Sequence, residues 1–238
     1  GQPGPASADL QGHHSWVASL AVSPVGDPTL MSASYNGHLI RWDLHDDIAT
    51  LGIDRLAHQG FIRAVAYSPD GQLVATCGND LVVRVWKPSG TLVKELRGHS
   101  SHVYNVAFHP SGKSLVSGDL MGILKQWDTS TWQQTRELDA KVLEKYDESF
   151  YAHCGGIRSL DFSPDGKQLV VSGVSDVTNA FAGIAVPTAV LFDWETGKRL
   201  RILKPQNTTD GSCCGVRFSP AGDFIVGAGG RGSGSLWF

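Results

Sequence analysis

Short apolar runs separated by polar turns recur along the whole chain. Five times an apolar stretch enters a turn in which glycine follows proline by two residues: LAVSPVGD at 20–27, VAYSPDGQ at 65–72, VAFHPSGK at 106–113, LDFSPDGK at 160–167 and VRFSPAGD at 216–223. Proline presets φ and glycine adopts positive φ, so each turn predicts a hairpin between two strands. A further apolar run, a second turn and a third run then lead to an aromatic residue, at Trp42, Trp86, Trp127, Phe192 and Trp237. This repetition predicts an all-β repeat protein.

A second set of residues recurs in the same register. Gly-His or Ala-His precedes four of the five units, and a serine or threonine follows in the next run. Unit two adds an acid four residues later, so that it holds His58, Thr76, Asp80 and Trp86. The other units are incomplete. Unit one has His13, Ser32 and Trp42, with Asn36 at the acid position, and unit three has His99, Ser117 and Trp127, with Met121 at that position. Unit four has His153, Ser172 and Asp176, with Phe192 in place of tryptophan.

These motifs resemble the WD40 family, whose units carry Gly-His, a Ser-Pro-Asp-Gly turn, a Ser/Thr strand, an Asp turn and Trp-Asp. The resemblance covers about residues 10–238. It implies an all-β WD40 β-propeller of four-stranded antiparallel blades around a central channel. It also implies that the His, Ser/Thr, Asp and Trp side chains form a buried hydrogen-bond chain within a blade. We therefore interpret the hydroxyl, imidazole and carboxylate as structural and not as a hydrolase triad.

The repeats define the expected domain organisation. A Pro/Gly-rich segment at 1–9 precedes a single propeller domain at 10–238, with units at about 10–50, 51–96, 97–138, 139–204 and 205–238, the last lacking its outer strand. The family usually closes with seven blades, so five units predict a fragment of a seven-bladed propeller. A closed five-bladed ring is the alternative, with residues 6–11 supplying the missing strand. In finer detail NAFAG at 179–183, FDWETGK at 192–198 and the GSLWF ending resemble planctomycete-type bacterial WD40 proteins.

Charge and cysteine content narrow the class of partner. The chain has 20 basic and 23 acidic side chains and no basic run, which argues against nucleic acid and anionic membranes. No stretch approaches the ~20 apolar residues of a membrane span. The four cysteines show no zinc-ligand spacing and favour a reducing compartment, with the cytoplasm mildly preferred. GAGGRG at 227–232 lacks the strand–helix context of a dinucleotide site. We expect no catalytic residues, cofactor or metal, and a monomer if the full propeller is present.

Two insertions distinguish unit four. DAKVLEKYDESFYA at 139–152 separates units three and four, and VTNAFAGIAVP at 177–187 expands a turn within unit four. In a propeller both connections emerge on one face, so the insertions should be neighbours. The candidate partner-binding residues are Tyr146, Phe150, Tyr151, Phe181 and Ile184, because aromatic side chains on scaffolded loops are typical of interaction sites. The alternatives are that the loops only pack on each other, or that Asp147, Glu148 or His153 is catalytic.

The sequence therefore favours a non-catalytic protein–protein interaction scaffold that binds a protein partner on the face with these insertions. Two alternatives remain. One is a small-ligand-binding or enzymatic propeller that uses the channel mouth. The other is a sensor or targeting part of a longer multidomain protein.

Overall fold

The computed structural model describes residues 10–45, 48–179, 184–205, 211–230 and 233–237. In this part of the chain every regular element except one 3₁₀ turn is a β-strand. Six antiparallel sheets are present in the described residues, five of three or four strands that follow one another along the sequence and one two-stranded hairpin, and within each sheet neighbouring strands are consecutive in the chain. This is the all-β, propeller-type architecture that the repeats predict, and only the five larger sheets are called blades below.

The first three blades have four strands each. Blade one comprises β1 (Val17–Val22), β2 (Thr29–Ser34), β3 (His38–His45) and β4 (Ile48–Leu56). Blade two comprises β5 (Ile62–Tyr67), β6 (Val74–Gly78), β7 (Val83–Trp86) and β8 (Leu92–Leu96). Blade three comprises β9 (Val103–Phe108), β10 (Ser114–Asp119), β11 (Ile123–Asp128) and β12 (Gln134–Asp139).

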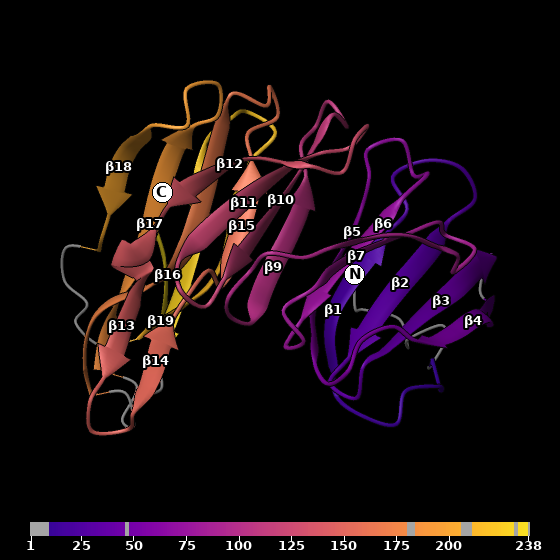
Figure 1. Cartoon of the computed structure of the whole chain (residues 1–238), viewed down its shortest axis with the longest axis horizontal. Coiled ribbons are helices and arrows are strands. Elements are labelled where there is room, and N and C mark those ends of the chain that lie inside the picture. Colours follow the sequence, from indigo (N-terminus) through magenta and orange to yellow (C-terminus); the bar gives the residue numbers. More distant parts are fainter. Residues whose placement is uncertain (1–9, 46–47, 180–183, 206–210, 231–232, 238) are drawn as a thin grey trace, which may run out of the picture.

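Blade four comprises β15 (Ser159–Phe162), β16 (Gln168–Asn179), β17 (Ile184–Asp193) and β18 (Arg199–Leu203). Blade five has three described strands, β19 (Ser212–Phe218), β20 (Phe224–Gly230) and β21 (Ser233–Trp237). Figure 1 shows the blades side by side, with β1–β4 at the right and β16–β18 at the left. The innermost strands contact one another in the order β1, β5, β9, β15 and β19.

Apolar layers between adjacent blades hold the fold together. Between blades three and four, for example, Val116 and Leu124 pack with Ile157, Leu169 and Phe192. Similar clusters join blades one and two, two and three, and four and five. Because blades two to four are covered on both faces, their strands read as nearly continuous apolar runs rather than as an alternating pattern.

The proline–glycine turns form as the sequence predicts. In blade two the Ser68 hydroxyl donates to Asp70 Oδ1 at 2.6 Å and accepts from the Leu73 amide at 2.9 Å. Gly71 has a φ of 69°, a conformation that costs glycine little. The same side-chain bridge recurs in blade four between Ser163 and Asp165 at 2.7 Å. These turns fix the register of the two innermost strands of their blades.

The structure adds detail to the expected unit limits. Blade one extends to Leu56, beyond residue 50, because β4 pairs with β3 until Leu56 lies opposite His38. The 139–152 insertion contains a 3₁₀ turn, Lys141–Leu143, and most of a hairpin of β13 (Glu144–Asp147) and β14 (Ala152–Gly155). The 177–187 insertion lengthens β16 and β17, which still pair at Ser175–Val186 and Asn179–Ile184. Residues 1–9, with most of the expected 6–11 strand, and Phe181 lie outside the described residues.

Candidate interaction face

The complete set of blade two forms one continuous hydrogen-bond chain. His58 Nδ1 lies 2.8 Å from Asp80 Oδ1, and His58 Nε2 lies 2.8 Å from Thr76 Oγ1. Trp86 Nε1 donates to the same threonine oxygen at 2.9 Å. The chain ties the segment before β5 to β6 and β7. Since His58 is 2% exposed and Thr76 0% exposed, a substrate has no access to the imidazole or the hydroxyl.

Burial and charge set the protonation of this group. Burial lowers the pKa of His58, which outweighs the opposing effect of its hydrogen bond to Asp80, so the imidazole is neutral at pH 7. Burial alone would raise the pKa of Asp80, but hydrogen bonds from His58 and Arg84 hold it well below its usual value. Arg84 Nη1 lies 2.6 Å from Asp80 Oδ2. The carboxylate is therefore ionised and accepts from both neighbours.

Blade three also completes its set, with an acid at a position other than the one that sequence spacing predicts. His99 Nδ1 lies 2.7 Å from Asp119 Oδ2, His99 Nε2 lies 2.7 Å from Ser117 Oγ, and Trp127 Nε1 donates to Ser117 at 2.9 Å. The expectation that Met121 leaves this unit without an acid was wrong. Asp119 comes two residues earlier, at the end of β10, whereas Asp80 of blade two lies in the turn after β6.

Blade one has the hydroxyl and the tryptophan but no acid. His13 Nε2 lies 2.6 Å from Ser32 Oγ, which also accepts from Trp42 Nε1 at 2.8 Å. Asn36, at the acid position, accepts instead from the Ser34 hydroxyl at 2.6 Å. The buried His13 Nδ1 has no hydrogen-bond partner among the described residues. The missing carboxylate thus leaves one buried ring nitrogen unsatisfied.

Blade four does not bring His153, Ser172 and Asp176 together. His153 lies on β14, opposite Tyr146, and its Nδ1 is 2.6 Å from Glu144 Oε1. Asp176 pairs with Lys204 at 2.5 Å. The buried Ser172 Oγ has no hydrogen-bond partner within the described part of the chain.

Two changes account for this difference. The 139–152 insertion continues as a hairpin, which carries the imidazole of His153 out of the blade. Phe192 stands where the other blades have tryptophan, and Val171 rather than Ser172 takes the pairing position of Ser117, so Ser172 points to the opposite side of the sheet. Leu143 belongs to the 139–152 insertion. It is fully buried and packs with Ile157 and Phe192.

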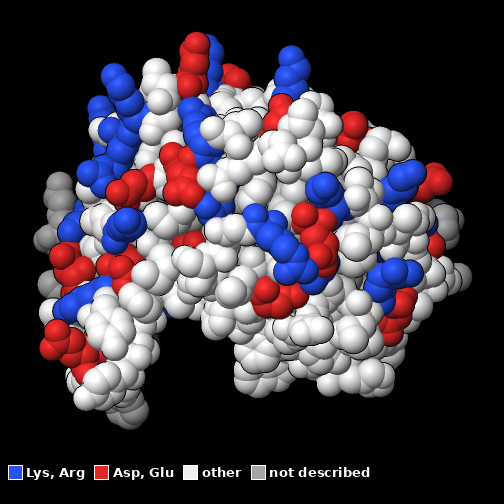
Figure 2. All heavy atoms as spheres, viewed as in Figure 1, with Lys and Arg blue, Asp and Glu red and all other residues white. Residues whose placement is uncertain are grey.

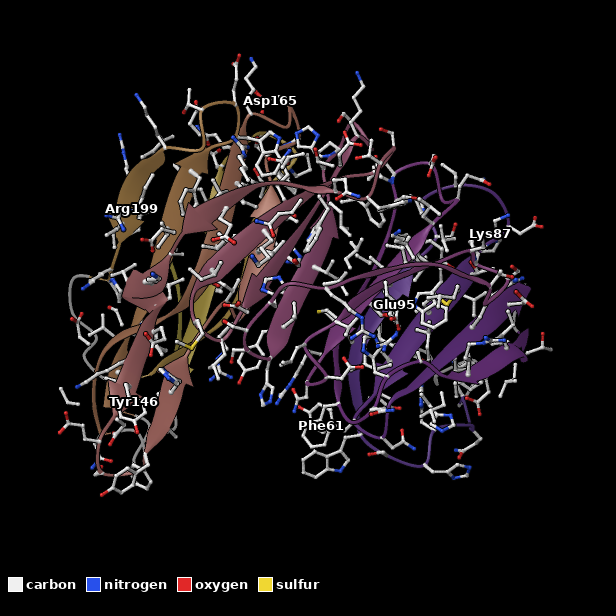
Figure 3. All side chains as sticks on the ribbon, in the orientation of Figure 1. Phe61, Lys87, Glu95, Tyr146, Asp165 and Arg199 are labelled. Carbon is white, nitrogen blue, oxygen red and sulfur yellow. The ribbon has the colours of Figure 1, made fainter. Side chains whose placement is uncertain are left out.

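The β13–β14 hairpin projects from the blades and presents aromatic side chains. Tyr146 is 45% exposed, Phe150 49% and Tyr151 84%. Figure 3 shows Tyr146 at the lower edge of the view, on the side where Phe61 also lies, whereas Asp165 in a proline–glycine turn lies at the opposite edge. We call the face with Phe61 and Tyr146 the insertion face.

The hairpin is held in a defined position. Asp147 Oδ1 accepts from the amide of Ser149 at 2.9 Å and from the amide of Phe150 at 3.3 Å, which closes the tip. Lys145 Nζ donates to the Val177 carbonyl at 2.6 Å, which ties β13 to the lengthened β16. The two insertions are therefore neighbours. Ile184 begins β17, where it pairs with Asn179 of β16.

An apolar cleft of about 270 Å³ opens beside the hairpin. Four of its lining residues are apolar, namely Leu120, Val174, Val177 and Ala185. Its polar lining residues are Tyr104, His153, Cys154 and Arg158. Burial raises the pKa of the Cys154 thiol, which keeps it protonated at pH 7. A larger cleft of about 420 Å³ lies at the opposite edge, between the proline–glycine turns of blades four and five.

Sequence reasoning missed a row of aromatic and arginine side chains that crosses blades one to four. Tyr35 and Phe61 stack at 4.3 Å, and Trp16 lies 6.1 Å from Tyr35. The Arg63 guanidinium lies 5.2 Å from the Phe61 ring and 4.9 Å from the Tyr104 ring, and that of Arg158 lies 5.3 Å from Tyr104. We call this row the Arg–aromatic strip: Trp16, Tyr35, Phe61, Arg63, Tyr104 and Arg158.

One sequence signal could have revealed part of the strip. Arg63, Tyr104 and Arg158 each follow the first apolar residue of an innermost-strand segment, after Ile62, Val103 and Ile157. Residues in equivalent positions of adjacent blades lie side by side. An alignment of the repeats therefore predicts that these three side chains are neighbours. Trp16, Tyr35 and Phe61 come from connecting segments, and only the structure places them.

Comparison with known proteins agrees with this geometry. A protein-family model described as "WD domain, G-beta repeat" matches residues 5–43, 51–87, 90–128 and 145–176, which is more than half of the chain. The chain belongs to the WD40-repeat family. The solved structure of Kuenenia stuttgartiensis hydrazine synthase superposes on this WD40 chain with a TM-score of 0.71 at 18% identity, covering 95% of this chain and 60% of that one. At this identity the likeness concerns the fold alone.

Curated relatives come from larger proteins. Apoptotic protease-activating factor 1 of Rattus norvegicus is 31% identical over 169 residues, 69% of this chain and 13% of the relative. The probable coatomer subunit beta' of Schizosaccharomyces pombe is 29% identical over 126 residues, 52% of this chain and 16% of the relative. The target of rapamycin complex subunit wat1 of the same yeast is 29% identical over 132 residues, 56% of this chain and 41% of the relative. This chain thus spans less than half the length of each of them.

Two kinds of feature are absent from the described residues. Within the ranges given above, no helix has the length and apolar character of a membrane span. In the same ranges, no group of three or more His, Cys, Asp or Glu side chains is arranged to hold a metal ion.

Proposed function

We propose that this chain is a non-catalytic protein–protein interaction scaffold that binds a protein partner on the insertion face. The observation that carries the proposal is the β13–β14 hairpin, an anchored element that exposes Tyr146, Phe150 and Tyr151. Tyrosine and phenylalanine contribute large contact areas at a small entropy cost, so a fixed aromatic tip is suited to association. Figure 2 shows basic and acidic groups interspersed on the visible face, which supports a protein partner over a polyanion.

The family and the relatives support the same function. Two yeast relatives are named as subunits, one of coatomer and one of a target of rapamycin complex. WD40 blades present their loops from a rigid frame, as other interaction scaffolds do.

The backbone at the hairpin tip favours a functional role for its aromatic residue. Tyr151 has a φ of 51°, in the left-handed region that non-glycine residues seldom adopt. Asparagine tolerates this conformation better than tyrosine, yet the position carries an 84% exposed tyrosine. An interaction that uses the ring explains why the less favourable residue stands there.

Chemistry at the neighbouring cleft is a weaker candidate. Cysteine reacts as its thiolate, and burial raises the pKa of Cys154, which disfavours that form. His153 is engaged by Glu144 at 2.6 Å and stacks edge-on with Tyr146 at 5.0 Å. Neither group has the activated geometry of a nucleophile and its base.

A pull-down with matched variants tests the proposal. The bait is the full chain, and the test variant is Tyr146→Ser with Tyr151→Asn, which keeps the strand register and suits the positive φ at 151. The control is Ile202→Ser, which removes a comparably exposed apolar side chain from β18. We expect one partner to be retained by the wild type and the control and lost by the test variant. Capture of the same proteins by all three baits would refute the proposal.

A further inference from the structure

The Arg–aromatic strip and the apolar cleft meet at Tyr104 and Arg158, which belong to both. The strip thus leads along the insertion face to the cleft, where Leu120, Val177 and Ala185 form an apolar lining. In Figure 2 this side of the molecule is hollowed between the projecting part at the lower left and the rest of the body. A single elongated ligand could therefore contact the strip and the cleft together.

The two arginines of the strip differ from three other arginines of the chain in having no ion pair within the described residues. Arg41, Arg84 and Arg97 form ion pairs with carboxylates of this chain. Arg63 donates its Nε to the neutral Asn79 at 2.9 Å, and no described carboxylate forms an ion pair with Arg63 or Arg158. Both guanidinium groups instead lie over aromatic rings, which orient a cation without neutralising it. The strip therefore presents two positioned cations to the solvent side of the molecule.

The geometry indicates what these cations bind. Both lie within about 5 Å of the same Tyr104 ring, so one ligand that covers this ring can reach both. A planar guanidinium pairs best with carboxylate or phosphate, to which it can donate two parallel hydrogen bonds. The cleft of about 270 Å³ falls just below the usual ~300–1,000 Å³ of a small-molecule site, which suits one or two inserted side chains.

We propose that the Arg–aromatic strip and the cleft bind an extended acidic peptide segment of a partner protein. An apolar side chain of the segment enters the cleft, and flanking carboxylates pair with Arg63 and Arg158. This rests on the proposed scaffold function and deepens it by naming the chemistry of the partner. The exposed rings of Trp16 and Phe61 extend the contact along the peptide.

Nucleic acid fits the strip less well. A single strand would stack its bases on the rings, but affinity for a phosphate backbone depends on many basic contacts. The strip supplies two, and the neighbouring hairpin carries Glu144 and Asp147, which repel a uniform polyanion. A peptide can place its carboxylates only where the arginines lie.

Selection from a random peptide library tests the proposal while the partner itself is still unidentified. Phage-displayed dodecapeptides are panned against the full chain, and the recovered peptides are resynthesised with a fluorescein label for polarisation measurements. We expect enriched sequences with at least two Asp or Glu residues around a Leu, Ile, Phe or Trp. Arg63→Gln with Arg158→Gln should weaken their binding at least about tenfold. The single variant Arg158→Gln, at an exposed side chain, should give part of this loss if the double variant folds poorly.

Arg199→Gln is the matched control, because Arg199 is an exposed arginine on β18, away from the strip (Figure 3). It should bind the selected peptides as the wild type does. Peptides without acidic residues, equal binding by the Arg63/Arg158 variant, or tighter binding of a labelled twelve-residue oligo(dT) would overturn the proposal. If non-acidic peptides are selected and lost on Tyr146→Ser with Tyr151→Asn, the acidic-peptide proposal fails while the scaffold function stands.

Discussion

Blades three and four carry histidine and serine at nearly the same spacing, and they use these residues differently. In blade three His99, Ser117, Asp119 and Trp127 are joined by hydrogen bonds. In blade four His153 lies on a projecting hairpin and Ser172 Oγ is left without a partner in the described structure. Blade four nevertheless packs as tightly, because Leu143, Ile157 and Phe192 are almost fully buried. Apolar packing can therefore replace the hydrogen-bond chain. The segment that connects blades three and four is then not tied to the inner strands by its histidine.

The comparison also shows what each arrangement provides. A satisfied chain ties the connecting segment to the inner strands and fixes it. Blade four gives up this tie and holds its connecting segment through Lys145 and the lengthened β16. The hairpin can then extend away from the blade and expose Tyr146 and Tyr151. We infer that the loss of the buried set and the gain of a projecting hairpin are one structural change.

The largest expected effect is a difference in stability between a variant of the blade-three acid, Asp119, and a variant of the blade-four acid, Asp176. Asp119 uses both carboxylate oxygens, one for His99 and the other for the amides of Met121 and Ile123, and Asp119→Asn leaves only one acceptor oxygen. We expect the free energy of unfolding to fall by about 2 kcal/mol in urea titrations followed by circular dichroism. Asp176→Asn removes a more exposed ion pair with Lys204 and should change it by less than about 0.5 kcal/mol. Equal losses in the two variants would remove the distinction between the blades.

The serines should respond in opposite directions. Ser117→Ala removes the oxygen that His99 and Trp127 share, and we expect the free energy of unfolding to fall by about 1.5 kcal/mol. Ser172→Ala removes a buried hydroxyl that has no partner among the described residues, and the variant should be as stable as the wild type or up to about 1 kcal/mol more stable. Thermal and urea unfolding measure both. A clear destabilisation by Ser172→Ala would mean that blade four has a working hydrogen bond after all.

Blade one offers a gain-of-stability test. Asn36 occupies the position that Asp80 holds in blade two, four residues after the Ser/Thr, and His13 Nδ1 is unsatisfied within the described part of the chain. Asn36→Asp supplies a carboxylate to this nitrogen, and we expect the free energy of unfolding to rise by about 1 kcal/mol at pH 7. The variant Asn36→Ala controls for the loss of the bond from Ser34. No gain from the aspartate would show that spacing alone does not build the set.

The smallest expected effect is a dependence of stability on pH. Burial lowers the pKa of His58 and of His13 below the usual 6.5. The unfolded chain therefore takes up protons before the folded chain does, so this contribution is complete above pH 6.5 and is lost as the pH falls. Asp80, whose pKa is lowered, adds stability that is lost only at more acidic pH. Urea titrations at pH 7.5 and 5.5 should show lower stability at pH 5.5, and an unchanged or higher value would contradict these directions.

The sequence predicted the all-β propeller fold because each blade repeats the same local signals. Turns such as Ser68–Gly71 are encoded by a few adjacent residues, and apolar runs on both sides identify the strands. Family membership confirmed this part. The acid of blade three escaped prediction because a carboxylate two residues after the serine reaches the histidine as well as one four residues after the threonine does, which spacing alone does not reveal.

The candidate site was only partly predictable. The 139–152 and 177–187 insertions stand out as extra length between repeats, and their proximity follows from the topology of a propeller. The hairpin of the 139–152 insertion depends on pairing between Glu144 and Gly155 and between Tyr146 and His153. No local sequence motif predicts this pairing. The Arg–aromatic strip is assembled from four blades, so its members are far apart in sequence and meet only after the blades pack.

Site-specific photo-crosslinking tests the central claim most directly. A benzophenone amino acid replaces Tyr151 at the hairpin tip or, in a control, Leu200 on the outer strand β18, which is also exposed. After irradiation in a lysate of the organism that encodes the chain, the account predicts one partner, identified by mass spectrometry, that crosslinks from position 151 and not from 200. The purified partner should then bind wild type more tightly than Tyr146→Ser with Tyr151→Asn. Crosslinking only from position 200, or equal products from both positions, would contradict the assignment of the insertion face.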